Sequence, residues 1–301
     1  MDQKTIIKRI KELKKKKNAI ILVHNYQIPE IYEVADFMGD SLKLCLEAAR
    51  TKARMIVFCG VNFMAESAAI LNPGKKVVVP HIDAGCSMAD MVDIDEVKKL
   101  QKKYPKAKTV CYINSTADVK AISDIVCTSA NAVKVIKSLK AKQIIFVPDK
   151  NLAAYVAKEV PEKEIIAYDA FCPAHHAITK EDLKDIIKTY PKASIIAHPE
   201  CRPEVLKLAN HITSTEGMIK AAREDKAKDF FILTECGMTE RLKKELPGKS
   251  FQGLCNICFD MKKNTPELIL KALETEKPEI KVDREIGLKA KKAFDRMFAV
   301  K

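Results

Sequence analysis

The stretch AIILVHNYQIPEIYEVADFMGDSLKL, which begins at Ala19, returns twice in related form further along the chain. The second version is AKTVCYINSTADVKAISDIVCTSANA, from Ala107, and the third is ASIIAHPECRPEVLKLANHITSTEGM, from Ala193. Aligned without gaps, the three versions share their apolar runs and several polar positions. Self-similarity at a fixed period indicates that the chain is built from three similar supersecondary units.

Four columns of this alignment carry polar side chains at equivalent places. They are His24, Tyr112 and His198; Tyr26, Asn114 and Glu200; Asp36, Asp124 and Asn210; and Ser41, Ser129 and Thr215. The register also reaches Cys86, Cys172 and Cys258, which stand 86 residues apart. Among ten cysteines one such spacing can arise by chance, but not together with the four polar columns.

The hydrophobic period predicts the same elements in each unit. A basic amphipathic helix, over residues 5–17, 94–104 or 180–190, precedes a short apolar strand. A helix that opens near Pro29, Ser115 or Pro203 follows, and then a second strand with its helix. A third strand, over 77–79, 165–168 or around Phe251, precedes the cysteine. Strands that alternate with helices predict a small parallel sheet with right-handed crossovers.

We therefore expect an α/β fold of three homologous α/β/α domains arranged about a pseudo-threefold axis. The expected domains are residues 1–88, 89–174 and 175–264, called units 1, 2 and 3 below. The tail, 265–301, should form two helices, from Thr265-Pro266 and over 283–298, that pack on unit 1 and complete it. Functional side chains gather at the carboxyl ends of parallel strands, so the active site should lie at the central junction.

Composition excludes several classes of protein. The chain has 301 residues, of which 47% are hydrophobic and 31% charged, as in globular proteins. No apolar run approaches the ~20 residues of a membrane helix, and no signal peptide is visible, so we expect a cytoplasmic protein without membrane contact. The net charge of +13 is spread over helical positions, and the chain has no tryptophan, so we expect no nucleic-acid partner.

The three equivalent cysteines predict a metal centre. Without a secretory context, ten cysteines indicate thiols, metal or catalysis rather than disulfides. Structural zinc sites and [4Fe–4S] clusters usually take four ligands, so a cluster held by three cysteines keeps one iron open as a Lewis acid. Spacing alone favours a cluster, with zinc and inert buried thiols as alternatives.

Other columns suit acid–base chemistry and anion binding. The acid–base candidates are His24, Tyr26, Tyr112, His198 and Glu200, for which hydrogen-bonded core positions are the alternative. Ser41, Ser129 and Thr215 stand near predicted helix starts, where hydroxyls and free N–H groups bind carboxylate or phosphate. Plain N-capping is the alternative for these hydroxyls.

Two local motifs are weaker indications of function. Cys255 and Cys258 form a CxxC pair, but a metal at Cys258 would leave Cys255 as a bystander or a redox sensor. His175 and His176 follow Cys172 closely and could place an imidazole beside the metal, although neither is predicted to be a ligand. The glycines form no Rossmann or Walker fingerprint, so no dinucleotide or ATP site is indicated.

The sequence resembles the quinolinate synthase family, the iron–sulfur enzymes of bacterial and archaeal NAD biosynthesis. The matching stretches are HNYQ from His24, ADFMGDSLKL, FCGVNFMAESAAIL, AGCSMAD, CYINSTADVKA, CTSANA, HPEC, STEGM and CxxMxxN from Cys258. They extend from about residue 20 to residue 264, and the tail fits as well. The resemblance implies three stacked α/β/α domains with a [4Fe–4S] cluster bound by Cys86, Cys172 and Cys258.

The resemblance also implies the reaction, in which iminoaspartate and dihydroxyacetone phosphate condense to quinolinate with loss of phosphate and two waters. It assigns catalysis to Tyr26, Tyr112, His198 and Glu200, and substrate binding to His24, Asp40, Ser41, Asn114, Ser129, Ser214 and Thr215. An enzyme that produces iminoaspartate is the implied functional partner. Three rival classes remain: another cluster-dependent enzyme on the same plan, a zinc hydrolase, and a basic nucleic-acid-binding protein.

Overall fold

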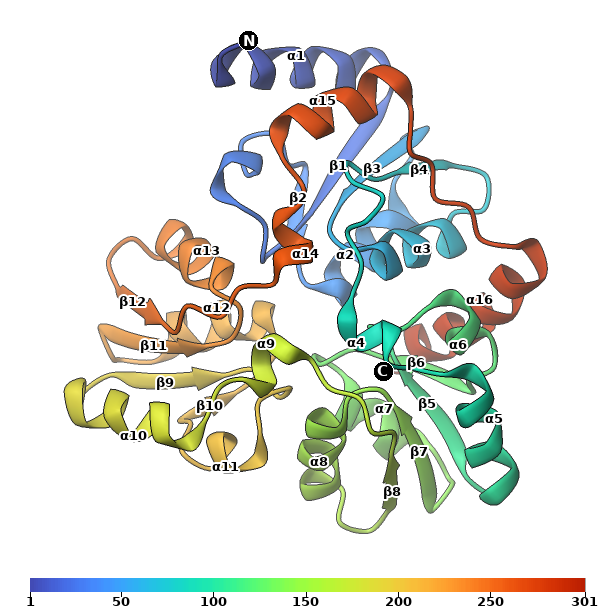
Figure 1. Ribbon diagram of the computed structural model, residues 1–301, viewed down its shortest axis with the longest axis vertical. Helices are drawn as coiled ribbons and strands as arrows, with labels where there is room; N and C mark the ends of the chain where they lie inside the picture. The colour runs from blue at the N-terminus through green and yellow to red at the C-terminus, as the bar shows by residue number, and fades with distance from the viewer. Residues whose placement is uncertain (301) are drawn as a thin grey trace.

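A four-stranded parallel sheet with one strand order occurs three times in the computed structural model, which describes residues 1–300 (Figure 1). Unit 1 has the order β2-β1-β3-β4, unit 2 the order β6-β5-β7-β8 and unit 3 the order β10-β9-β11-β12. The strands are β1 Ala19–His24, β2 Phe37–Gly39, β3 Met55–Cys59, β4 Lys76–Val78, β5 Lys108–Tyr112, β6 Ile125–Cys127, β7 Gln143–Val147, β8 Glu164–Ala167, β9 Ser194–Ala197, β10 His211–Ile212, β11 Asp229–Leu233 and β12 Ser250–Gly253. The α/β fold of three repeated units is confirmed.

The prediction of three strands per unit is wrong. Each sheet has a fourth strand, β2, β6 or β10, which pairs with the first strand over three, three and two residues respectively. Segments this short carry no readable period, which explains why the sequence did not reveal them.

Helices cover the sheets as the repeat predicts. The lead-in helices are α1 Gln3–Lys16, α5 Ile94–Lys103 and α10 Lys180–Thr189, and the elements near Pro29, Ser115 and Pro203 are single turns, η1 Pro29–Ile31, α6 Ala117–Ala121 and α11 Pro203–Leu206. The second and third strands are followed by α2 Ser41–Arg50, α3 Asn62–Leu71, α7 Ala132–Ser138, α8 Lys150–Glu159, α12 Thr215–Glu224 and α13 Gly237–Glu245. One-turn helices, α4 Ser87–Asp90, α9 Pro173–His176 and α14 Phe259–Lys262, lie toward the middle of Figure 1, where the units meet.

The column of Asp36, Asp124 and Asn210 has a structural role. Each side chain accepts a hydrogen bond at 2.8 Å from a backbone N–H of the first strand of its unit, at Ile21, Thr109 and Ile195. Each backbone N–H returns a bond at 2.9 Å to the carbonyl of that same strand residue. The pair of bonds ties the loop before the short strand to the first strand and sets the register of the sheet edge.

The two tail helices pack on different units. Helix α15, Pro266–Thr275, lies against α1 and β3 of unit 1, as expected. Helix α16, Arg284–Phe298, was expected on unit 1, but it packs chiefly on α6 and β6 of unit 2 and touches α3 less. An apolar stripe shows which face of a helix is buried, but not which part of the protein that face packs against. Because α6 is short, it leaves room for α16 on the same side of the unit 2 sheet.

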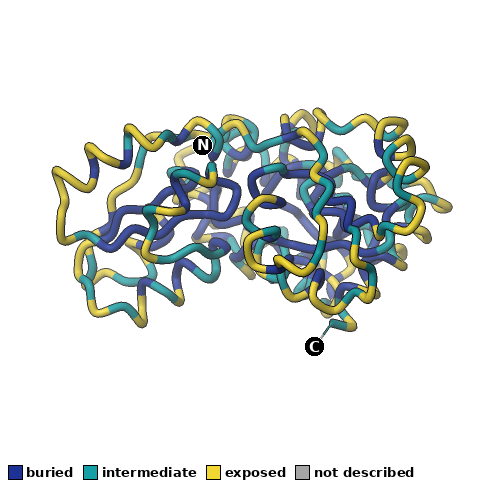
Figure 2. Tube along the Cα trace, turned by 90° about the horizontal axis from the view of Figure 1, so that it is seen from below, coloured by how far each residue is buried: buried dark blue, intermediate teal, exposed yellow. Residues whose placement is uncertain are grey.

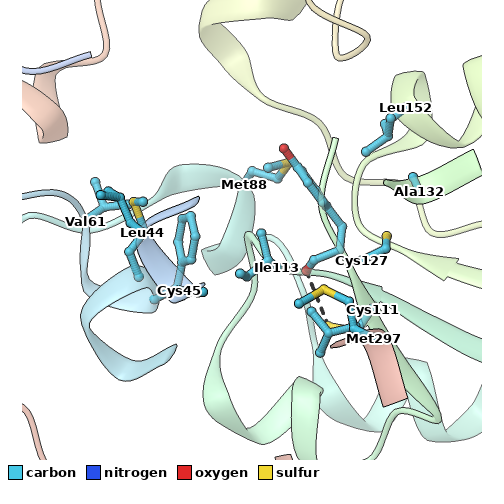
Figure 3. Close-up of a cluster of buried hydrophobic side chains, with 14 of the residues drawn as sticks. Leu44, Cys45, Val61, Met88, Cys111, Ile113, Cys127, Ala132, Leu152 and Met297 are labelled. Carbon is cyan, nitrogen blue, oxygen red and sulfur yellow. Dashed lines mark hydrogen bonds between the residues drawn. The ribbon is translucent and has the colours of Figure 1, made fainter. Parts of the chain in front are cut away.

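One hydrophobic cluster runs through all three units. It includes Leu22 of unit 1, Val110 of unit 2, Ile196 of unit 3 and Phe294 of α16. Figure 3 shows Cys111 of unit 2 beside Met297 of α16, while Leu44 and Val61 of unit 1 lie further to the left in the same cluster. Figure 2 shows buried strands in the interior and exposed residues along the outer helices. Because the core is shared, the domain boundaries stay a prediction.

No helix within residues 1–300 has the length and apolar character needed to cross a membrane.

Replacing Asp124 tests the loop-to-strand bonds. Asp124→Ala leaves the N–H of Thr109, a residue only 1% exposed, without its acceptor, so the free energy of unfolding should fall by about 1–3 kcal/mol. Asp124→Asn keeps an acceptor, as Asn210 does in unit 3, and should cost no more than the exposed ion pair with Lys108, about 0–1 kcal/mol. Urea denaturation measures both values, and equal losses would contradict the assignment.

Candidate active site

A cavity of about 460 Å³ lies at the junction of the three units. It takes side chains from the carboxyl ends of β1, β5 and β9 and from the segments that lead into α4, α9 and α14. Of the residues that the sequence assigned to the site, all except Ser214 line it: His24, Tyr26, Asp40, Ser41, Cys86, Tyr112, Asn114, Ser129, Cys172, His198, Glu200, Thr215 and Cys258. Ser214 reaches it through Asp40, whose Oδ2 accepts from the Ser214 hydroxyl at 3.1 Å.

The three cysteines occupy matching places in the backbone. Cys86, Cys172 and Cys258 are the N-cap residues of α4, α9 and α14, and all three have extended backbone angles. Burial raises the pKa of each thiol, to about 12 for Cys86. Coordination to a metal deprotonates a thiol outright. Three buried thiols that face one cavity from three units therefore form a donor set that fits a metal centre.

A buried carboxylate organises the polar side of the cavity. Glu200 is 2% exposed, and its Oε1 accepts from the Tyr112 hydroxyl at 2.5 Å and more weakly from Asn114 at 3.5 Å. Its Oε2 lies 2.8 Å from Nδ1 of His175. Burial raises the pKa of Glu200, but His175, His198 and the hydrogen bonds more than offset it, so the carboxylate is ionised with a pKa of about 2.

A chain of hydrogen bonds links this carboxylate to Tyr26. The Tyr26 hydroxyl lies 2.6 Å from Oγ1 of Thr234, and that oxygen lies 2.7 Å from Nε2 of His175. Nδ1 of His175 lies 2.8 Å from Oε2 of Glu200 and 3.1 Å from the sulfur of Cys172, so the same network reaches a cysteine. Burial and Glu200 raise the pKa values of Tyr26 and Tyr112 far above the usual range, so both phenols keep their protons.

Two imidazoles in the cavity are held neutral. Burial lowers the pKa of both His24 and His198 to about 3, with Lys262 adding to the effect at His24. Nε2 of His198 lies 3.2 Å from the Ser129 hydroxyl. A neutral imidazole offers a substrate one N–H donor and one nitrogen acceptor.

The hydroxyls stand where anions can bind. Ser41 and Thr215 are the first residues of α2 and α12, but the caps of these helices are Asp40 and Ser214. Ser129 lies before Asn131, the N-cap residue of α7. N-capping therefore does not account for Ser41, Ser129 and Thr215, which line the cavity, although the Thr215 hydroxyl also accepts from Nδ2 of Asn25 at 2.9 Å.

Asn114 carries an unused acceptor. Its side-chain oxygen is buried and has no hydrogen-bond partner within residues 1–300. A buried amide oxygen without a partner costs free energy unless a ligand or water satisfies it. The atom is therefore placed to accept a hydrogen bond from a bound molecule.

Sequence reasoning missed several residues of the site. His175 was signalled by the CPAHH motif but was not assigned to the site, whereas Thr234 and Glu235 carried no signal of their own. His175, Cys172 and Glu200 also bring possible metal-ligating atoms within 4.8 Å of one another. Cys255 is an exposed free thiol at the cavity edge, and all the cysteines are free, as the sequence suggested.

The fold and the cavity define a class of protein. It is a three-domain α/β enzyme whose thiol-lined centre is suited to metal binding and whose buried tyrosine, histidine and carboxylate groups are suited to proton transfer. The sequence profile of the family described as quinolinate synthetase A protein matches residues 8–299. The chain belongs to this family, and the resemblance drawn from its motifs is confirmed.

Curated relatives match along their full length. The quinolinate synthase of Alkaliphilus metalliredigens is 51% identical over 303 residues, which cover 100% of both chains. That of Thermodesulfovibrio yellowstonii is 52% identical over 296 residues, 98% of each chain. That of Methanosarcina barkeri is 52% identical over 303 residues, 100% of this chain and 99% of the relative.

The neutral state of His24 predicts a pH dependence of stability. The unfolded chain protonates this histidine near pH 6.5 while the folded chain does not, so stability is lost as the pH falls from 6.5 toward 3. His24→Asn removes the contribution of this histidine to the pH dependence of the unfolding free energy. The decrease in unfolding free energy between pH 6.5 and pH 5 should therefore be smaller than in the wild type by about 1–2 kcal/mol. Urea titrations at the two pH values give the comparison; equal losses in both proteins would mean that His24 is protonated in the fold.

Proposed function

We propose that this protein is a quinolinate synthase of de novo NAD biosynthesis, which acts in the cytoplasm. It condenses iminoaspartate with dihydroxyacetone phosphate to give quinolinate, phosphate and two waters. Its full-length relatives carry this name, and the observation that carries the proposal within the molecule is one cavity lined by three equivalent thiols and the Glu200–Tyr112 pair.

Cys86, Cys172 and Cys258 would hold a [4Fe–4S] cluster, one cysteine from each unit. When bound by three cysteines, such a cluster offers an open iron that polarises hydroxyl, carbonyl or carboxylate oxygens of the substrate as a Lewis acid. The buried thiols and the repeat symmetry support this centre over a surface site. The cluster is also the reason to prefer this reaction class to simple acid–base catalysis.

The tyrosines and histidines supply the proton transfers that the condensation and the two dehydrations require. Tyr112 keeps its proton on the phenol oxygen and hydrogen-bonds to an ionised Glu200, so it is placed to donate to a leaving hydroxyl. The neutral His198 can position a substrate oxygen or N–H group by hydrogen bonding at Nε2. The chain Tyr26–Thr234–His175 can return a proton toward Glu200.

The substrates are anions, yet no lysine or arginine is among the residues that line the cavity. Their carboxylates and phosphate must therefore be held by hydroxyls and by helix amino ends. Ser41 and Thr215 open α2 and α12, whose free N–H groups favour anions. Ser129 can add a hydroxyl donor, and the unpaired Asn114 oxygen can accept a hydrogen bond from a hydroxyl or N–H group of the substrate. Iminoaspartate hydrolyses in water, so a nearby enzyme that produces it is the expected functional partner.

A zinc hydrolase is the second candidate, because Cys172, His175 and Glu200 could also hold a metal ion. Each of the last two donors already has a partner in the protein: Glu200 accepts from Tyr112 and His175 contacts Thr234. A zinc ion would have to displace the hydrogen bond between His175 and Glu200. Of the three cysteines, Cys172 contacts Nδ1 of His175 at 3.1 Å, and the three-cysteine set is the one that the repeat symmetry favours.

Iron analysis of cysteine variants tests the centre. Anaerobically purified wild type should contain about four irons per chain and be brown. Cys86→Ala, Cys172→Ala or Cys258→Ala should each lose most of the iron and the activity, because a cluster with two protein ligands is not retained.

Cys201→Ala and Cys111→Ala are the matched controls, since both thiols are fully buried and neither lines the cavity. They should keep wild-type iron. A ligand-position variant with full iron would refute that assignment, and a colourless wild type that binds one zinc would favour the hydrolase.

Ser129→Ala tests anion binding by the hydroxyls. Loss of one hydrogen bond to a charged group costs about 1.5–3 kcal/mol, so KM for an anionic substrate should rise roughly 10- to 150-fold. Iron content should not change, because Ser129 contacts His198 and not a cysteine. Steady-state kinetics at varied substrate concentration measure KM, and unchanged kinetics would give Ser129 a purely structural role.

A further inference from the structure

Two buried carboxylates stand behind the cysteines at equivalent places. In the repeat register, Asp149 of unit 2 corresponds to Glu235 of unit 3, and each follows the third strand of its sheet by two residues. Asp149 has an exposed fraction of 0% and Glu235 of 1%. Two buried acidic side chains at one register position are not explained by helix capping alone.

Asp149 joins a helix start to a cysteine. Its Oδ1 accepts from the backbone N–H groups of Asn151, at 2.7 Å, and Leu152, at 2.9 Å, and so caps α8. Its Oδ2 accepts from the backbone N–H of Cys172 at 2.8 Å. That N–H belongs to the residue whose thiol faces the cavity.

Glu235 makes the same connection in unit 3. Its Oε2 accepts from the N–H of Gly237 at 2.7 Å, and its Oε1 accepts from the N–H of Cys258 at 3.2 Å. Lys262 lies 2.9 Å from Oε1 and also donates to the backbone carbonyl of Tyr26. Glu235 thus fixes a cysteine of unit 3 and, through Lys262, the segment of unit 1 that carries Tyr26.

Unit 1 departs from this arrangement. The equivalent residue is Val61, which has no side-chain acceptor to offer Cys86. The three cysteines are therefore equivalent in sequence register but not in the way that their backbone is held.

We propose that Asp149 and Glu235 are positioning residues for Cys172 and Cys258. This inference rests on the proposed function, because it concerns the cluster that these cysteines would hold. Each carboxylate accepts a hydrogen bond from the peptide group that leads into a ligand and so fixes that peptide group. Hydrogen-bonded groups behind metal ligands tune both metal affinity and reduction potential.

Asp149→Asn separates positioning from folding. Asparagine caps helices as well as aspartate does, so its oxygen can keep the bonds to Asn151 and Leu152. Its NH₂ group then faces the N–H of Cys172, which loses its acceptor. The variant should keep its fold but unfold at a somewhat lower urea concentration, because the N–H of Cys172 is left unpaired, and it should release iron to a ferrous chelator about 10–100 times faster.

Two further variants make the test independent of one substitution. Glu235→Gln should also speed iron release, and both variants should shift the cluster potential because the hydrogen bonds behind Cys172 and Cys258 change. Asp149→Glu, which installs the carboxylate used in unit 3, should restore slower release. The matched control is Asp283→Asn, since Asp283 caps α16 through the N–H groups of Glu285 and Ile286 far from the cavity.

Release rates and potentials of Asp149→Asn and Glu235→Gln that match the wild type would overturn the inference. A wild-type protein that assembles no cluster at all would instead overturn the proposed function. The two failures are therefore distinguishable in the same experiment.

Discussion

The central junction depends on the contacts that the ionised carboxylate of Glu200 makes with its neighbours. Glu200 belongs to unit 3, takes a hydrogen bond from Tyr112 of unit 2, and contacts His175 beside Cys172. A charge buried this deeply is stable only while its partners surround it. The units must therefore meet in one relative orientation, and that orientation also brings the three thiols to the same cavity. Packing of the shared hydrophobic cluster reinforces it.

The sequence repeat predicted the features that the three units share. The position of Cys172, for example, followed from the register alone, and so did the strand ends that carry His24 and His198. What the register could not reveal are contacts between units. Thr234 belongs to the site only because Tyr26 and His175, which are distant from it in sequence, contact its hydroxyl. The prediction that α16 packs on unit 1 is wrong, because an apolar stripe shows which face of a helix is buried but not which unit covers that face.

The net charge of the chain contrasts with the lack of cationic side chains in the cavity lining. The chain carries a net charge of +13, yet no cationic side chain lines the cavity. A positive outer surface raises the local concentration of small anions. The cavity itself offers hydroxyl and amide groups, so a small anion bound there would be held by hydrogen bonds and not by ion pairs with lysine or arginine.

The position of α16 has a consequence for biogenesis. The helix comes from the last part of the chain, but it covers β6 and α6, which are made less than halfway through synthesis. Unit 2 therefore leaves the ribosome with an apolar surface that only the finished chain can cover. Cys258 is made 172 residues after Cys86 and 86 residues after Cys172. The packing of unit 2 must therefore wait until α16 has been made, after all three cysteines.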